Sequence, residues 1–162
     1  MIQRIQTVWL FLAGLFICGL FIFPYLNYMD LVGLGRKVYV TGVYSDANNE
    51  ISKQDISKIT FIFQTIYTVL IAAFPLYIIF LFKNRKKQIQ FIILEIILVA
   101  LLGLWMYATS SSLLVESNKY LSADNIGVGF FLLPISIIML AMAMGGIRKD
   151  DKLIKSADRL RP

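Results

Sequence analysis

The sequence predicts an all-α membrane protein with four transmembrane helices, and its composition and four long apolar runs support this prediction. Of its 162 residues, 58% are hydrophobic and only 16% are charged, and the mean hydropathy is +0.72. Soluble globular domains have a less apolar composition. A bilayer core about 30 Å thick needs roughly 20 apolar residues per helical crossing. We place the four spans at about residues 6–27, 59–82, 88–109 and 125–147, which makes residues 1–147 a four-helix bundle.

The first apolar run also has to be considered as a secretory signal peptide. Its apolar core is long, no small-residue cleavage pattern follows it, and the bulky residues LFI precede Cys18. These features do not fit a cleaved signal. We therefore expect the first run to be a retained anchor, with Cys18 inside the membrane.

The basic residues predict the orientation of the spans. One basic residue precedes the first run, four lie in the turn between the second and third runs, and six lie in the C-terminal tail. Short cytoplasmic loops carry an excess of Lys and Arg. We therefore expect both termini to be cytoplasmic. The net charge of +6 is then a topology signal that also suits anionic lipid, and nucleic acid is not an expected partner.

The loop after the first run, at about residues 30–58, is the only long connection expected on the extracytoplasmic side. Its segment KVYVTGVYSDANNE combines β-branched and aromatic residues with turn-forming residues. This pattern favours a short strand or a hairpin. An irregular loop over the end of the bundle is the alternative.

The tail, residues 148–162, is predicted to be a cytoplasmic amphipathic helix. Leu153, Ala157 and Leu160 recur at helical spacing and form an apolar stripe. Asp151 and Lys155 are four residues apart, a spacing that stabilises exposed helices. A helix this short is marginal in water by itself. We expect it to pack on lipid, on its own bundle or on another protein.

The sequence has little that could support catalysis. It contains no His and a single Cys, so the usual ligands of zinc and haem are missing. None of the common nucleotide-binding or hydrolase motifs occurs. We therefore expect no enzyme activity, no metal site and no cofactor.

Glu95 is the one Asp, Glu, Lys or Arg residue within the predicted spans. Such a residue is a functional candidate because a lone charge in hydrocarbon is unfavourable. One interpretation makes Glu95 a proton or cation site. The other, which we favour from the sequence, is an acid that reaches the basic turn at Arg85, Lys86 and Lys87, or Arg4 on a neighbouring helix.

The two ends of the chain resemble a known family. MIQRIQ at the start and IRKDDKLIKSADRLR at the end are similar to the ends of a Bacteroidetes family of small four-span membrane proteins of unknown function. The resemblance implies an inner-membrane location and supplies no activity. Both ends are expected on the cytoplasmic face, where we expect them to form one docking surface. Its candidate residues are Gln3, Arg4, Gln6, Arg148, Lys149, Asp150, Asp151, Asp158, Arg159 and Arg161.

Two functions remain open from the sequence. The first is a non-enzymatic accessory or scaffold subunit that docks a membrane protein, or a second copy of itself, through its cytoplasmic ends or its extracytoplasmic loop. The second is a small oligomeric transporter or channel that uses Glu95 and the irregularities at Pro75 and Pro134.

Overall fold

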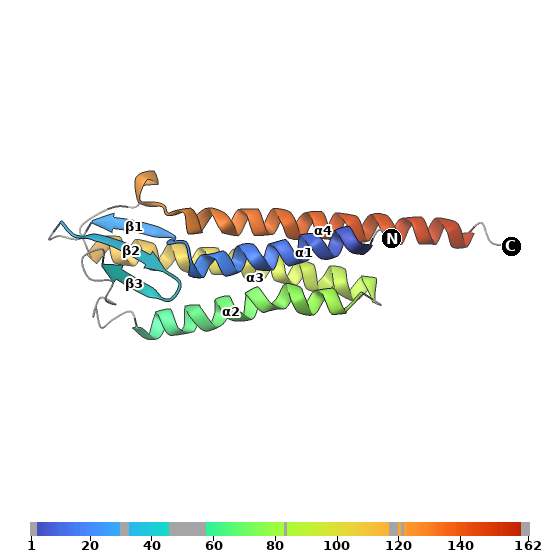
Figure 1. The fold of residues 1–162 in the computed structure, drawn as a ribbon, viewed down its shortest axis with the longest axis horizontal. Helices are drawn as coiled ribbons and strands as arrows, with labels where there is room; N and C mark the ends of the chain where they lie inside the picture. Colours follow the sequence, from blue (N-terminus) through green and yellow to red (C-terminus); the bar gives the residue numbers. More distant parts are fainter. Residues whose placement is uncertain are drawn as a thin grey trace.

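The computed structural model describes residues 3–29, 33–45, 58–82, 84–116, 120 and 122–159. Within these residues, four helices lie side by side and a small sheet covers one end of them (Figure 1). The elements are α1 (Gln3–Cys18), the 3-10 turn η1 (Gly19–Phe21), β1 (Leu26–Met29), β2 (Gly35–Tyr39), β3 (Gly42–Ser45), α2 (Lys58–Phe80), α3 (Arg85–Glu116), the 3-10 turn η2 (Ala123–Asn125) and α4 (Val128–Arg159).

The helices pack through narrow inward stripes. α1 and α3 each contact both α2 and α4. Buried residues on α3 recur every three or four positions, as at Ile92, Val99, Leu102 and Met106, which is the spacing of one helix face. The outward faces of these helices are apolar as well. In the most apolar 18-residue stretch of each helix, only 33% of the residues of α2, and 28% of those of α3 and of α4, are buried. Such extensive exposed apolar surface suits contact with lipid.

Three helical segments are long and apolar enough to cross a membrane: Ile59–Phe80, Arg85–Val115 and Val128–Leu153. The first apolar segment is shorter, Ile5–Phe21, so the predicted first span of residues 6–27 extends too far. The chain turns around Pro24, and β1 begins at Leu26. Leu26 and Tyr28 are buried on one face of β1, and this alternation is typical of a strand. The average hydropathy of the segment is the same whether it forms a strand or continues a helix, so it does not reveal the boundary.

The predicted hairpin is confirmed and is part of a larger sheet. β1, β2 and β3 form an antiparallel sheet in that order, with Val38 paired to Leu26 on one side and to Val43 on the other. The sheet therefore starts at residue 26, before the predicted loop of residues 30–58. The Thr65 hydroxyl of α2 donates a hydrogen bond to the Val40 carbonyl at 2.8 Å. The sheet and helices share one hydrophobic core.

The start of α4 is held against the end of the first helical segment. The Gly127 amide donates to the Tyr25 carbonyl and the Gly129 amide donates to the Pro24 carbonyl, both at 2.9 Å. A Cβ atom on Gly127 would lie only 2.2 Å from the Pro24 oxygen. Close backbone approach therefore requires glycine at this position.

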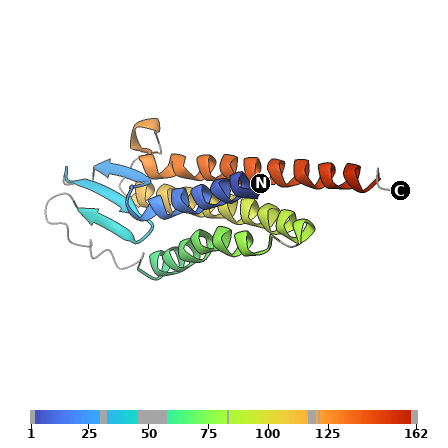
Figure 2. The ribbon, with the colours of Figure 1, turned by 45° about the vertical axis from the view of Figure 1, so that its right-hand side comes forward.

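Two further boundaries differ from the sequence expectations. α3 continues to Glu116, past the predicted span end at residue 109. α4 runs without a break through residue 148, where we expected a separate tail helix. Gly145 and Gly146 both lie inside α4, so this pair of glycines does not end the helix. α4 extends beyond the N-terminal end of α1 and the α2–α3 turn (Figures 1 and 2).

Candidate functional site

The N-terminal end of α1 is hydrogen-bonded to α4. Gln6 Nε2 donates to Asp150 Oδ2, and both side chains are buried. Gly146 makes this approach possible, since a Cβ atom there would lie 3.0 Å from Gln6 Cγ. Gln6, one of the N-terminal candidate residues, is therefore bonded to Asp150, one of the C-terminal candidates.

The structure describes the side chains of five of the ten candidate docking residues. Gln6 and Asp150 are buried against each other and do not present their polar groups to a partner. Arg148 and Lys149 are exposed, and Asp151 is half-buried. The side chains of Gln3, Arg4, Asp158 and Arg159, and all of Arg161, lie outside the described residues. Of the predicted set, Arg148 and Lys149 are the exposed residues that the structure describes.

Replacing Gln6 with Leu is expected to lower the free energy of unfolding by about 1.5–3 kcal/mol, because it leaves the buried Asp150 carboxyl without this donor. The double variant Gln6→Leu, Asp150→Leu should recover most of the loss, since two apolar partners leave no unsatisfied group. A double-mutant cycle of unfolding in detergent measures the coupling. Strictly additive losses would contradict a direct bond.

Glu95 lies on the inward stripe of α3, between Ile92 and Val99, and is fully buried. Neither of its carboxyl oxygens has a hydrogen-bond partner among the described residues. The bond from Glu95 to Arg85, Lys86 or Lys87 that the favoured sequence interpretation required is absent among the described residues, because neither carboxyl oxygen has a partner. Lys87 lies eight residues from Glu95, which is about 12 Å along the helix, and Lys86 and Lys87 are both exposed. The alternative partner, Arg4, has a side chain outside the described residues.

One phenol, that of Tyr67, lies near Glu95. Tyr67 of α2 is close enough to Glu95 to interact with it electrostatically. The Tyr67 hydroxyl itself donates to the Leu98 carbonyl at 3.1 Å. One residue further along α2, the buried Thr68 hydroxyl donates to the Gln64 carbonyl at 2.8 Å. Both hydroxyl hydrogens are thus directed to backbone oxygens and away from the carboxyl.

Gln64 and Tyr25 are buried polar residues that the sequence analysis missed. Both amide atoms of the Gln64 side chain and the Tyr25 hydroxyl are buried without a partner in hydrogen-bond geometry within the described part of the chain. Burial raises the pKa of Tyr25, which follows α1 in the chain, to about 12; the adjacent side chains of Thr109 and Gln64 offset this only partly. Gln64 lies on the inward stripe of α2, between Phe61 and Thr68, and no feature of the sequence by itself marks it.

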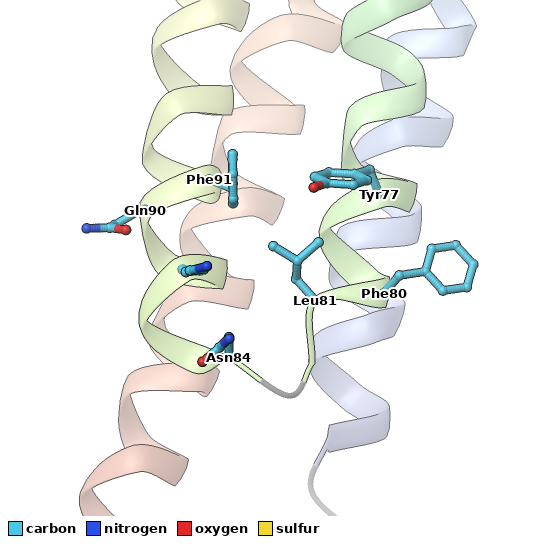
Figure 3. Close-up of a pocket in the computed structure, with 7 residues that line it drawn as sticks. Tyr77, Phe80, Leu81, Asn84, Gln90 and Phe91 are labelled. Carbon is cyan, nitrogen blue, oxygen red and sulfur yellow. The ribbon is translucent and has the colours of Figure 1, made fainter.

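A pocket of about 520 Å³ lies between the end of α2 and the start of α3. Tyr77 and Phe91 extend into the space between the two helices from opposite sides, and Leu81 lies between them and the turn (Figure 3). Their rings meet edge to face, with centroids 5.9 Å apart. The residues that line the pocket are Tyr77, Phe80, Leu81, Asn84, Lys87, Gln90 and Phe91.

Comparison with known proteins gives a family and no activity. A search of curated proteins finds no significant match to this chain. A family described as "Domain of unknown function (DUF4293)" matches residues 2–160. The apolar helices are compatible with a multi-pass membrane protein. Because the family match covers nearly the whole length, the chain belongs to the DUF4293 family of domains of unknown function.

Proposed function

We propose that this protein is a four-span protein of the bacterial inner membrane that serves as a non-enzymatic accessory or scaffold subunit. The observation that carries the proposal is the end of α4, which continues as a helix beyond the Gln6–Asp150 bond and past the other helix ends (Figure 2). Leu153 is exposed on this end. An amphipathic helix with an apolar stripe is a common ligand of grooves on other proteins.

The dimensions of the first helical segment support a fourth crossing. The 16 residues of α1 rise about 24 Å at 1.5 Å per residue, and the three residues of η1 add about 6 Å. Their sum matches a bilayer core of about 30 Å. With four crossings, the basic α2–α3 turn and both termini share the cytoplasmic side, as the positive-inside rule favours. The inner membrane is the location that the Bacteroidetes resemblance implies.

The docking proposal predicts that Leu153→Ser weakens partner binding about tenfold or more, because a buried Leu contributes roughly 1.5–3 kcal/mol to an interface. The neighbouring exposed residue supplies a matched control, Lys152→Ser, which should change binding less than threefold. Both variants keep the Gln6–Asp150 bond and should fold normally. The measurement is quantitative mass spectrometry of proteins retained by the tagged chain from native membranes in mild detergent.

A chain without residues 152–162 should insert normally and lose the same partners. If gentle extraction and crosslinking recover only the lone protein, the docking proposal is wrong. If the retained protein is a second copy of the chain, the partner is a homo-oligomer.

A second function has a specific observation in its favour. Glu95 is fully buried and its carboxyl oxygens are unpartnered within the described residues, and Gln64 is a second unsatisfied polar side chain in the same core. Intramembrane carboxyl groups of this kind occur in proton relays of pumps and transporters. A small oligomeric transporter or channel would use Glu95 as its proton or cation site. Flux into reconstituted vesicles that Glu95→Gln abolishes would support this second function.

A further inference from the structure

We propose that the pocket between α2 and α3 is a binding site for one anionic phospholipid on the cytoplasmic leaflet. The proposal rests on the membrane placement given above and is independent of docking through α4. The pocket volume of about 520 Å³ lies within the range of small-molecule sites. It can hold a headgroup and the first part of an acyl chain.

The pocket has a charged end at the turn and an aromatic end deeper between the helices, in the same order as the headgroup and acyl chains of a phospholipid. Asn84 lies at the turn, at the start of α3, whereas Tyr77 and Phe91 lie about two turns deeper between the helices (Figure 3). The turn end therefore offers the polar groups of Asn84 and Lys87 beside Leu81 and Phe80, and the deeper end offers two aromatic rings beside Gln90. A headgroup at the turn would place its acyl chain against the rings, which is the order that the bilayer itself imposes.

The charge of the turn end selects the type of headgroup. Lys87 lines the pocket, and Arg85 and Lys86 stand beside it in the first turn of α3, which has no acidic residue. No acidic residue is among those lining the pocket. Basic residues near a membrane surface attract anionic lipid. Phosphatidylglycerol and cardiolipin have the negatively charged headgroups that this basic end would attract, whereas phosphatidylcholine has no net charge.

The deeper end of the pocket is preformed by aromatic packing. Phe91 contacts both Phe74 and Tyr77 at centroid distances of 5.9 Å, and Phe74 stacks on Tyr77 at 6.0 Å. Edge-to-face and stacked pairs hold rings in defined positions. The rim is also apolar, since Phe80 is 77% exposed. A groove that opens on such a surface is reached from the lipid phase more readily than by a soluble peptide.

The experiment compares retention of phosphatidylglycerol and phosphatidylcholine with identical acyl chains by the full chain in mild detergent, using native mass spectrometry. We expect preferential retention of phosphatidylglycerol. Lys87→Gln should weaken it about fivefold, the effect of one basic residue near a membrane surface. The matched control is Lys86→Gln, which removes the same charge from the same turn but not from the pocket. It should weaken retention less than Lys87→Gln does, because Lys86 is near the membrane surface but does not line the pocket.

A second variant tests the shape of the pocket without changing its charge. Leu81→Trp should fill the groove and reduce retention of phosphatidylglycerol, and its thermal unfolding in detergent shows whether it folds. Binding of glycerol phosphate as tight as that of the lipid would contradict a role for the acyl chain. Equal effects of Lys86→Gln and Lys87→Gln, or equal retention of the two lipids, would overturn the site alone. Release of the protein from membranes by alkaline carbonate would overturn the membrane placement as well.

Discussion

Glu95→Met is expected to raise the free energy of unfolding by about 1–3 kcal/mol, because it removes a buried carboxyl group that has no hydrogen-bond partner in the described part of the chain. Met has a similar length and is flexible enough to fill the same space. The measurement is unfolding in mixed detergent and SDS, followed by circular dichroism. Few single substitutions in a packed core stabilise a protein, so the sign alone is informative.

Ile92→Met is the matched control for this prediction. It introduces the same side chain one turn away on the same inward stripe, and a volume-conserving swap should cost less than about 1.5 kcal/mol. If Glu95→Met destabilises the protein by more than the control, the carboxyl group has a partner in the working protein. A bound cation or a group on another subunit would be such a partner, and the transporter function would gain support over the accessory one.

Gly127→Ala is expected to lower the free energy of unfolding by at least about 2 kcal/mol, since its Cβ would lie 2.2 Å from the Pro24 carbonyl oxygen. The chain must separate there, and the adjacent hydrogen bonds of Gly127 and Gly129 to residues 25 and 24 would lengthen. Thermal unfolding in detergent measures the loss. Hydrogen exchange should locate it at the start of α4.

The control for the Gly127 prediction is Gly145→Ala. Gly145 lies inside α4, and a Cβ atom added there would have no described neighbour within 4 Å, so alanine should add about 0.5–1 kcal/mol of helix stability. Opposite signs for the two substitutions are the expected result. A loss at both positions would mean that α4 is constrained near residue 145 by a neighbour that the isolated chain does not include.

The helical segments were predictable because hydropathy and charge are local properties of the chain. Apolar runs of about 20 residues found α2, α3 and most of α4, and turn residues with β-branched neighbours found the β2–β3 hairpin. Segment ends were less predictable. The first two residues of β1, residues 26 and 27, were counted as part of the first span, since an apolar residue such as Leu26 adds to an apolar window whether it lies in a strand or continues a helix.

The candidate sites were predictable only in part, because their chemistry depends on which helix faces meet. Glu95 could be recognised from the sequence as an unusual intramembrane acid, but its lack of a partner among the described residues follows from the inward direction of its side chain. Gln64 carries no signal by itself, and its burial depends on the stripe that α2 turns toward the core. The pocket forms from the ends of two helices that a sequence window treats separately.

The sequence by itself determined the membrane-compatible class, the position of the apolar helices and the basic α2–α3 turn, because each depends on residues close together in the chain. Only the tertiary structure decided that Gln6 bonds to Asp150 across 144 positions, that α4 continues past the bundle and that Glu95 is buried away from the basic turn. Such contacts depend on the direction of each helix face and on how closely two backbones approach. Both are set by the packing of the whole chain.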